Sequence, residues 1–443
     1  MIKKFLLILF FLTPCLQNKL TSQTLYFPPL NNFQQWDTLS PSSLGWCTNQ
    51  IDSLYNFLQA ENTKAFIVLK DGKIVLEKYF GAFTSDSLWY WASAGKTITS
   101  FLVGQSQESG LLSIQDTTSK YLGQGWTNST LSQENKITIR NQLTMTSGLD
   151  DGVPDPYCTL DTCLNYLADA GTRWAYHNAP YTLLDQVLSN ATGQNLNTLT
   201  NTKIKSRIGM TGLWVASGYN NVFVSTARSM ARFGLLIQGR GIWQNDTLMH
   251  DVNYFNQMTN TSQNLNLSYG YLWWLNGKAS YMLPGFQFVF PGSYAIHAPS
   301  DMFSALGKNG QIVSLSPSQG IVVIRMGNAP SSPSSDIATI LCDQIWEYLQ
   351  AIQCNVGIEE ENVANMDNIT LFPNPVNDQL FIKGIDFKEN LVDLMLYDVL
   401  GNELESKMEG EYLDVSELKN GNYFLVLRDK SGQVSVKRFA ITK

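Results

Sequence analysis

Between residues 50 and 350, strand-forming segments lie near both ends, and a long helical region separates them. Two apolar runs, 65–69 and 74–79, flank Asp71-Gly72, a dipeptide that favours a hairpin turn. Strand signals return at 271–275, and again at 305–316 and 321–325 on either side of a Pro-Ser-Gln-Gly turn. This order predicts one antiparallel sheet that is built from both ends of the domain.

Helical periodicity marks most of the remaining stretch, where apolar residues recur at three- and four-residue spacing. Residues 111–260 read as mostly helical with long polar loops. The clearest helical segments are 50–60, 93–107, 183–188, 225–238 and 336–349. The predicted fold class is therefore α+β, an antiparallel sheet flanked by helices with a helical subdomain. A cleft between the subdomain and the sheet is the natural place for a pocket.

The composition changes after Cys354. Residues 359–362 (EEEN) read as a short charged linker, and from Ile369 onward short apolar runs alternate with turns such as Asn420-Gly421. This pattern predicts a small all-β sandwich. We therefore predict a larger domain at residues 23–355, a linker at 356–368 and the sandwich at 369–443.

The first residues have the layout of a signal peptide for export. Lys3 and Lys4 precede the apolar run 5–12, and polar residues follow. We predict a signal peptide over residues 1–22, with cleavage near residues 18 to 23; a short buried helix is the alternative. No apolar run in the sequence reaches the length of a transmembrane span.

Export makes disulfide bonds possible, and five cysteines remain after the predicted cleavage. Cys158 and Cys163 flank four residues and form the pair that we predict. Cys342 and Cys354 flank a predicted helix and are a second possible pair, which leaves one cysteine over. No cysteine spacing indicates zinc, and with only three histidines we predict neither a metal site nor a cofactor.

The overall charge argues against one class of partner. The formal net charge is −7 over 443 residues, without a basic segment that would bind phosphates. We therefore expect no nucleic acid partner.

The segment WASAGK (residues 91–96) places a serine three residues before a lysine at the start of a predicted helix. Positions i and i+3 share one helical face, so the Lys96 ammonium is expected about one turn from the Ser93 hydroxyl. A serine needs an adjacent base to act as a nucleophile, and a lysine with a lowered pKa can supply it. Alternatively, Ser93 caps the helix. The same pattern recurs at Ser416 and Lys419.

A second candidate is Tyr176-His177-Asn178. A tyrosine near an ammonium ionises more readily and can carry a proton to a leaving group. The Asn178 amide can orient both the lysine and a bound carbonyl. Tyr-x-Asn also occurs at 219–221 and 254–256, and Tyr176 can simply be a buried tyrosine.

A third candidate is Lys308-Asn309-Gly310-Gln311, which leads into a strand. A strand edge beside a nucleophile can offer a backbone N–H to an oxyanion, and a glycine lets substrate approach the backbone. Asn309-Gly310 is alternatively the turn of a hairpin.

Residues 40–350 resemble the serine β-lactamase and penicillin-binding-protein superfamily, and most closely its class C, esterase and 6-aminohexanoate-dimer hydrolase branch. The motifs that carry the resemblance occur in order: WASAGK at 91–96, ITIRNQLTMTSGL at 137–149, GTRWAYHNAPYTLL at 171–184 and YGYLWW at 269–274.

The resemblance implies roles for these residues. Ser93 would attack a carbonyl and form an acyl-enzyme, with Lys96 and Tyr176 sharing the proton transfers. Asn178 would hold the substrate amide or carbonyl, and the backbone N–H groups of Ser93 and Gln311 would form the oxyanion hole. Lys308, Asn309 and Gly310 stand at the family's Lys-Thr/Ser-Gly motif; the asparagine departs from it and weakens any inference of carboxylate recognition.

The last 75 or so residues resemble the sorting domain of the type IX secretion system. The matching segments are LFPNPV at 371–376, LYDVLG at 396–401, LDVSEL at 413–418, NGNYF at 420–424 and VKRF at 436–439. Ser416 and Lys419 then belong to a structural module and are not catalytic candidates. The resemblance implies engagement of the type IX machinery through residues 369–443, and a secreted or outer-membrane surface location after export through the periplasm. A carbohydrate-binding or adhesive sandwich is the alternative.

The sequence therefore predicts a secreted serine hydrolase that cleaves an amide or ester bond in a small molecule. β-Lactamase activity, peptidase activity on D-amino acids, and a non-catalytic binding protein on the same scaffold stay open. Asp150, Asp151 and Asp155 can meet a cationic substrate group or can be solvated loop acids.

Overall fold

A computed structural model describes most of the chain. The described residues are 25–31, 35–331, 337–354, 369–384, 391–399, 401–410, 412–429 and 434–443. The predicted signal peptide at 1–22 and the predicted linker at 356–368 lie outside them. Within the described part of the chain, we find no helix whose length and apolar character would let it span a membrane.

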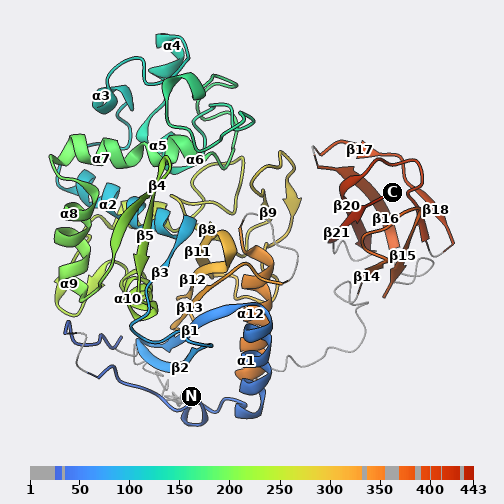
Figure 1. The fold of residues 1–443 in the computed structure, drawn as a ribbon, viewed down its shortest axis with the longest axis horizontal. Helices are drawn as coiled ribbons and strands as arrows, with labels where there is room; N and C mark the ends of the chain where they lie inside the picture. Colours follow the sequence, from blue (N-terminus) through green and yellow to red (C-terminus); the bar gives the residue numbers. More distant parts are fainter. Residues whose placement is uncertain are drawn as a thin grey trace, which may run out of the picture.

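The larger domain is built on a six-stranded antiparallel sheet in the order β2-β1-β13-β12-β11-β8 (Figure 1). Its strands come from both ends of the domain, which confirms the predicted topology. They are β1 (Thr63–Lys70), β2 (Lys73–Tyr79), β8 (Trp274–Leu275), β11 (Phe303–Gly307), β12 (Gln311–Ser316) and β13 (Ile321–Gly327). The α+β class is confirmed.

One strand prediction was wrong. Residues 305–316 form two strands, β11 and β12, joined by a turn at Lys308–Gly310. Asn309 and Gly310 have positive φ angles of 62° and 75° in this turn. Buried residues continue on both sides of the turn, so the apolar pattern does not mark the break; the Asn-Gly dipeptide does.

Helices cover both faces of the sheet. Gly234 of α10 (Ala227–Gln238) lies against Val313 and Val322, so closely that an added Cβ would come within 2.6 Å of the Val322 side chain. Ser314 follows Val313 directly on β12, and its hydroxyl accepts a hydrogen bond from Trp346 of α12 (Thr339–Ile352) at 2.9 Å. Adjacent residues of a strand point to opposite faces, so α10 and α12 pack on opposite sides.

The remaining helices lie beside α12 or in the helical part between β2 and β8. α1 (Ile51–Ala60) packs beside α12 (Figure 1). The others are α2 (Lys96–Glu108), α3 (Ser119–Leu122), α4 (Leu131–Glu134), α5 (Ile139–Leu143), α6 (Asn178–Thr182), α7 (Leu184–Thr192), α8 (Leu196–Thr200), α9 (Ser206–Ile208) and α11 (Val252–Met258).

Small sheets brace this helical part. β3 (Trp89–Tyr90), β4 (Leu213–Ser217) and β5 (Asn220–Ser225) form a three-stranded sheet in the order β3-β5-β4. There are also two short antiparallel strand pairs, one in the helical part and one after β8. These are β6 (Ile242–Trp243) with β7 (Asp246–Thr247), and β9 (Ser280–Tyr281) with β10 (Phe290–Pro291).

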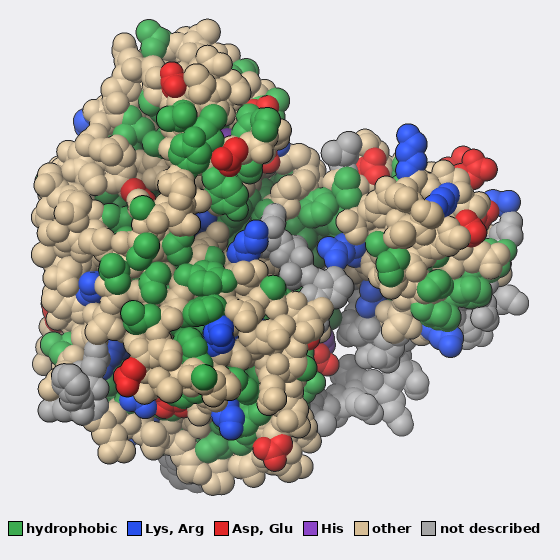
Figure 2. Space-filling model, in the orientation of Figure 1, with side chains coloured by type: hydrophobic (Ala, Val, Ile, Leu, Met, Phe, Trp, Pro, Cys, Tyr) green, Lys and Arg blue, Asp and Glu red, His purple; other side chains and the backbone are tan. Residues whose placement is uncertain are grey.

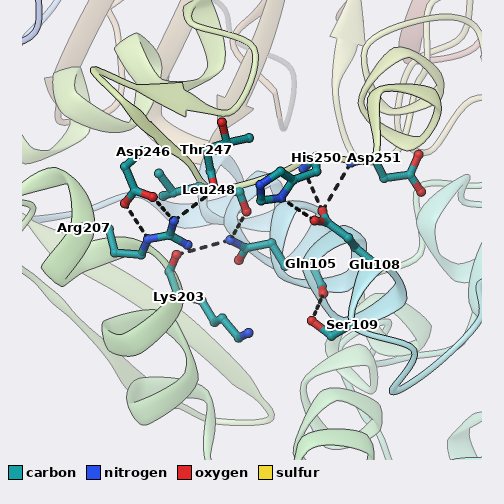
Figure 3. A network of polar contacts seen from close by, with 10 residues as sticks. All are labelled: Gln105, Glu108, Ser109, Lys203, Arg207, Asp246, Thr247, Leu248, His250 and Asp251. Carbon is teal, nitrogen blue, oxygen red and sulfur yellow. Dashed lines mark hydrogen bonds and ion pairs between the residues drawn. The ribbon is translucent and has the colours of Figure 1, made fainter.

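Helix α2 is buried along most of its length, and polar contacts fix its C-terminal end (Figure 3). Gln105 donates to the carbonyl of Leu248 at 2.7 Å and to that of Lys203 at 3.2 Å. Glu108 pairs with Nδ1 of His250 at 2.6 Å and accepts from the backbone N–H of the same residue at 2.8 Å. These contacts hold the helix whose first residue is Lys96.

The C-terminal domain contains two four-stranded sheets with a hydrophobic core of their own, which confirms the predicted β-sandwich. One sheet has the order β14-β15-β19-β18 and the other β17-β16-β20-β21. The strands are β14 (Thr370–Phe372), β15 (Gln379–Lys383), β16 (Leu391–Asp398), β17 (Glu403–Leu404), β18 (Lys407–Glu409), β19 (Tyr412–Asp414), β20 (Gly421–Asp429) and β21 (Val434–Ile441). Ser416 and Lys419 lie in the loop before β20.

The two domains touch through aromatic side chains. Phe424 of β20 lies 5.0 Å from the Phe290 ring and 5.5 Å from the Phe286 ring, and Tyr397 lies 5.0 Å from Phe288. Figure 2 shows hydrophobic side chains where the two bodies approach each other. Phe424 is buried although it is not part of the sandwich core, because the loop before β10 covers it.

Among the described residues, two disulfide bonds cross-link the chain. The predicted bond between Cys158 and Cys163 is confirmed. The other possible pair was wrong, because Cys354 bonds to Cys47 and Cys342 is free and buried. Helix α12 holds Cys342 and Cys354 apart by roughly 18 Å at 1.5 Å per residue, and a disulfide spans less than about 7 Å between Cα atoms.

Candidate active site

Ser93 sits in a tight 3-10 turn, Ala92–Gly95, between β3 and α2. Trp91 anchors the turn: its indole N–H donates to Ser225 at 2.8 Å, and its backbone N–H donates to the Phe223 carbonyl at 2.8 Å. Helix α2 starts at Lys96 with Gly95 as its N-cap, so Ser93 is not the cap of this helix. Its hydroxyl is half-buried and accepts a hydrogen bond from Lys96 instead.

Lys96 connects Ser93 to the Tyr-x-Asn segment. Its Nζ lies 3.0 Å from Ser93 Oγ and donates to Asn178 Oδ1 at 2.9 Å. The side chain is only 4% exposed, and this burial lowers the pKa of Lys96 to about 7, against an opposing effect of Asp185. Close to pH 7, a large fraction of such a lysine is neutral and can accept a proton.

Two tyrosine rings face the Lys96 ammonium. Nζ lies 4.2 Å from the Tyr181 ring centroid and 5.3 Å from that of Tyr176. Contacts of this kind stabilise the charged form modestly, by about 0.5–2 kcal/mol. They occupy the space around Nζ that water would otherwise fill.

Tyr176 is fixed by a cluster of aromatic side chains. Its ring stacks on Trp274 of β8 at 5.9 Å and meets Tyr269 edge-on at 6.3 Å. Trp174, Trp274 and Tyr269 are almost fully buried, so these rings form core packing and not an exposed aromatic cleft. This packing brings the helical part into contact with β8, the edge strand of the sheet, at Tyr176.

The other motif matches lie elsewhere. Tyr254 donates to the Ser100 carbonyl at 2.7 Å, and Tyr219 is exposed in the turn between β4 and β5. His177, next to Tyr176, is buried, and this lowers its pKa to about 4. His177 is therefore neutral at pH 7.

Strand β11 approaches the nucleophile turn at Gly307, a residue that the sequence analysis did not single out. β11 pairs with β8 only at Phe303 and Ser304, so the rest of that edge faces the turn. A Cβ at Gly307 would lie 2.5 Å from the Trp91 carbonyl oxygen and 3.0 Å from the Ala94 nitrogen. Only glycine fits there, and the next backbone N–H belongs to Lys308.

The segment Lys308–Gly310 is the hairpin turn that was the alternative interpretation. Gly310 was expected to let substrate approach the backbone, and this expectation stays a prediction. Its positive φ serves the turn, and its missing side chain leaves room for Arg325 and Leu341. Lys308 is exposed, and Asn309 donates to the Tyr90 hydroxyl at 2.8 Å.

Gln311 is a structural residue in this arrangement. Its side chain is fully buried and exchanges hydrogen bonds with the backbone of Gly327 on β13, at 2.7 and 3.1 Å. It pairs with Gly307 across the ladder, and the close contact with the nucleophile turn is made by Gly307. The expected oxyanion role of the Gln311 backbone N–H stays a prediction, and the backbone N–H that follows Gly307 belongs to Lys308.

Asp185 is a second residue that sequence reasoning did not single out. It lies near the start of α7, is 7% exposed, and accepts a hydrogen bond from Asn221 at 2.9 Å. Burial raises the pKa of Asp185 to about 7 against opposing effects of Asn221, Lys96 and Thr99. In the sequence, its spacing could have pointed to it: Asp185 follows Asn178 by seven residues in one helical run, so both lie on the same helical face.

The three loop acids have partners within the protein. Asp151 pairs with Arg173 at 2.6 Å. Asp150 and Asp155 accept backbone N–H groups of Gly152 and Tyr157, both at 2.9 Å. In the described part of the chain, no three His, Cys, Asp or Glu side chains come together in a way that could hold a metal ion.

Comparison with known families agrees with this geometry. A model of the beta-lactamase family matches residues 59–341, and a model of the secretion system C-terminal sorting domain matches residues 370–442. An uncharacterised protein of Alkalihalophilus pseudofirmus is 25% identical over 334 residues, which are 65% of this chain and 91% of that protein. The sorting domain indicates export and a cell-surface or secreted location.

Solved structures share the fold of the larger domain. A protein from Bacillus anthracis, assigned as a 6-aminohexanoate-dimer hydrolase, aligns with a TM-score of 0.54 and 18% identity over 72% of this chain and 87% of its own. A penicillin-binding protein homologue from Caulobacter crescentus aligns with a TM-score of 0.54 and 14% identity, covering 69% of this chain and 98% of its own. EstCE1, a hydrolase with promiscuous acyltransferase activity, aligns with a TM-score of 0.52 and 13% identity, covering 70% of this chain and 99% of its own.

Proposed function

Because the chain belongs to the beta-lactamase family, we propose that it is a secreted serine hydrolase that cleaves an amide or ester bond through an acyl-enzyme on Ser93. The observation that carries this proposal is the contact of 3.0 Å between Lys96 Nζ and Ser93 Oγ in a buried setting. The names given to two structural neighbours, one assigned as a 6-aminohexanoate-dimer hydrolase and the other a hydrolase with promiscuous acyltransferase activity, support this proposal.

In the first half of the reaction, neutral Lys96 takes the proton of Ser93 while Oγ bonds to the substrate carbonyl carbon. The carbonyl oxygen gains a negative charge and accepts hydrogen bonds from the backbone N–H groups of Ser93 and Lys308. As the bond to the leaving group breaks, Tyr176 gives that group a proton and regains one from Lys96. Asn178 orients Lys96 and donates its amide N–H to the substrate.

In the second half, water attacks the ester on Ser93. Its proton passes to the same Lys96 and Tyr176 pair, and Ser93 Oγ recovers a proton as the acid leaves. The enzyme returns to its starting state without a cofactor. We further propose that residues 23–355 form the hydrolase domain and that residues 369–443 engage the type IX secretion machinery, with 356–368 between them.

A panel of substrates tests the proposal: p-nitrophenyl esters, linear amide oligomers, D-alanyl peptides and nitrocefin. We expect turnover of at least one ester or amide, and a loss of roughly a thousandfold or more in Ser93→Ala and in Lys96→Ala, because the two residues act as a unit.

The second Ser-x-x-Lys match supplies a matched control. Ser416→Ala and Lys419→Ala lie in the C-terminal domain and should keep wild-type turnover. Turnover that persists in Ser93→Ala would overturn the proposal, as would no turnover of any substrate by a folded wild type.

A further inference from the structure

Two helix faces meet beside the nucleophile and carry polar residues in register. On α2, Lys96 and Thr99 are three residues apart and share one face. On the continuous helical run of α6 and α7, Asn178, Tyr181 and Asp185 are spaced by three and four residues and share the face toward α2. Lys96 binds Asn178 at 2.9 Å, and Thr99 lies 3.4 Å from the Tyr181 hydroxyl.

Asp185 is the last residue in this row of polar side chains between the two helices. Its Oδ2 accepts from Asn221 of β5, whereas its buried Oδ1 has no hydrogen-bond partner. A buried carboxylate with so few hydrogen-bond donors is costly unless a positive charge also acts on it. Among the described residues, the Lys96 ammonium is the cation that acts on this carboxylate, and Asp185 is the charged group that acts on Lys96.

Two tyrosines and two uncharged polar side chains also lie around this pair in the described part of the chain. Tyr181 of α6 has its pKa raised well above the usual value by burial and by Asp185, so its ring faces Lys96 in the neutral form. Tyr176 faces Lys96 with its ring, and Thr99 and Asn221 carry no charge. Burial and one carboxyl group across the helix interface therefore act in opposite directions on the charge state of Lys96.

Resting on the proposed function, we propose that Asp185 is a positioning residue that sets the fraction of neutral Lys96 available to activate Ser93. A carboxylate at residue 185 favours the ammonium form of Lys96. It keeps the lysine partly charged close to neutral pH, where burial alone would discharge it. Asn221 supports this role, because its amide stabilises the ionised carboxylate.

The direction of the change in pH dependence follows from the protonation state of Lys96 that reacts. Neutral Lys96 is the base, so activation of Ser93 rises with pH as the lysine loses its proton. Removing the negative charge of Asp185 lowers the pKa of Lys96 below about 7. The rising limb of the pH profile then moves to lower pH.

The test measures the second-order rate of Ser93 labelling by a fluorophosphonate from pH 5 to 9, which needs no knowledge of the substrate. In Asp185→Asn we expect the midpoint of the rising limb to fall by roughly one unit. Because burial raises the pKa of Asp185 to about 7, its charge acts mainly close to neutral pH, so the difference between the variant and wild type is expected to be largest near pH 7 and to shrink at lower pH. A purely structural role would lower the rate at every pH and leave the midpoint in place.

Two further variants sharpen the result. Asn221→Ala keeps the carboxyl group but removes its donor, so we expect a smaller shift in the same direction. Asp343→Asn removes a half-buried carboxylate that pairs with His297 on the other side of the sheet, and its midpoint should equal that of wild type. Unchanged midpoints in both Asp185→Asn and Asn221→Ala would overturn the proposal.

Failure of the proposed function gives a different result. If wild-type Ser93 is not labelled at any pH, the hydrolase assignment fails, and titration of 13C-labelled lysine by NMR still tests the coupling. The Lys96 resonance, assigned by its absence in Lys96→Ala, should titrate at lower pH in Asp185→Asn than in wild type. Equal titration in the two proteins would overturn the role of Asp185.

Discussion

At the scale of single residues, the surroundings of Lys96 decide whether it can act as a base. A lysine with its ordinary pKa is almost fully charged at pH 7, whereas a pKa of about 7 leaves roughly half of it neutral. The shift comes from burial against Tyr181 and Asn178, which lie more than 80 positions away in sequence. Motif spacing predicted that Ser93 and Lys96 are neighbours, but it could not predict this burial.

The close approach at Gly307 gives a prediction at the same scale. Gly307→Ala should lower the labelling rate of Ser93 by roughly tenfold to a hundredfold, because the added Cβ pushes the nucleophile turn away from β11. Gly307 has an extended backbone, with φ −126° and ψ 157°, so alanine is not strained there for other reasons.

Gly421→Ala is the matched control. Its Cβ would meet only the Tyr423 ring, at 3.7 Å, so labelling should not change. A wild-type rate in Gly307→Ala would show that the contact with the turn does not position Ser93. The sequence did not reveal this glycine, because its requirement arises from packing between segments about 200 positions apart.

At the scale of elements, the turn between β11 and β12 depends on one arginine. Arg325 of β13 is fully buried and donates to the carbonyl groups of Asn309 and Gly310 at 2.7 and 2.8 Å. It also binds the hydroxyl of Thr63 and the carbonyl of Glu61. The planar guanidinium thus ties the turn to the end of α1 and the start of β1.

We predict that Arg325→Lys lowers the free energy of unfolding by about 3 kcal/mol, since a lysine has three donors and leaves buried carbonyl groups unsatisfied. Urea denaturation followed by tryptophan fluorescence measures the change. Arg228→Lys is the control: Arg228 forms a partly exposed ion pair with Glu77, so its loss should cost no more than about 1 kcal/mol. Equal effects of the two substitutions would contradict the role of Arg325.

Elements with strong periodicity were predictable, and breaks inside apolar runs were not. The hairpin of β1 and β2 and helix α10 agree with the apolar pattern and the turn signal at Asp71-Gly72. The split of 305–316 into two strands was missed because the residues on both sides of the turn are buried. The role of the Lys308–Gly310 segment was ambiguous for a different reason: the family motif and a hairpin turn use the same residue types.

At the scale of the whole molecule, the bond between Cys47 and Cys354 closes nearly the entire larger domain. It joins residues 307 positions apart, whereas Cys158 and Cys163 are five positions apart. Long loops lose more unfolded-state entropy on cross-linking, in a model that gives roughly 6 kcal/mol for the long loop and about 2 kcal/mol for the short one.

The double variant Cys47→Ala/Cys354→Ala should therefore lower the melting temperature more than Cys158→Ala/Cys163→Ala does. Differential scanning calorimetry of the parent protein with both disulfide bonds and of both variants measures this order. The reverse order would mean that strain or residual structure outweighs loop closure. Sequence could not predict the long-range pair, because only the fold brings the segment before α1 beside the end of α12.

The identity of the nucleophile is tested most directly by mass spectrometry of the intact protein and its peptides after fluorophosphonate treatment. We predict one adduct per chain, on the peptide that contains Ser93, with none in Ser93→Ala and very slow formation in Lys96→Ala. An adduct on another residue, or one that persists in Ser93→Ala, would contradict the assignment of Ser93 and Lys96 as the catalytic pair.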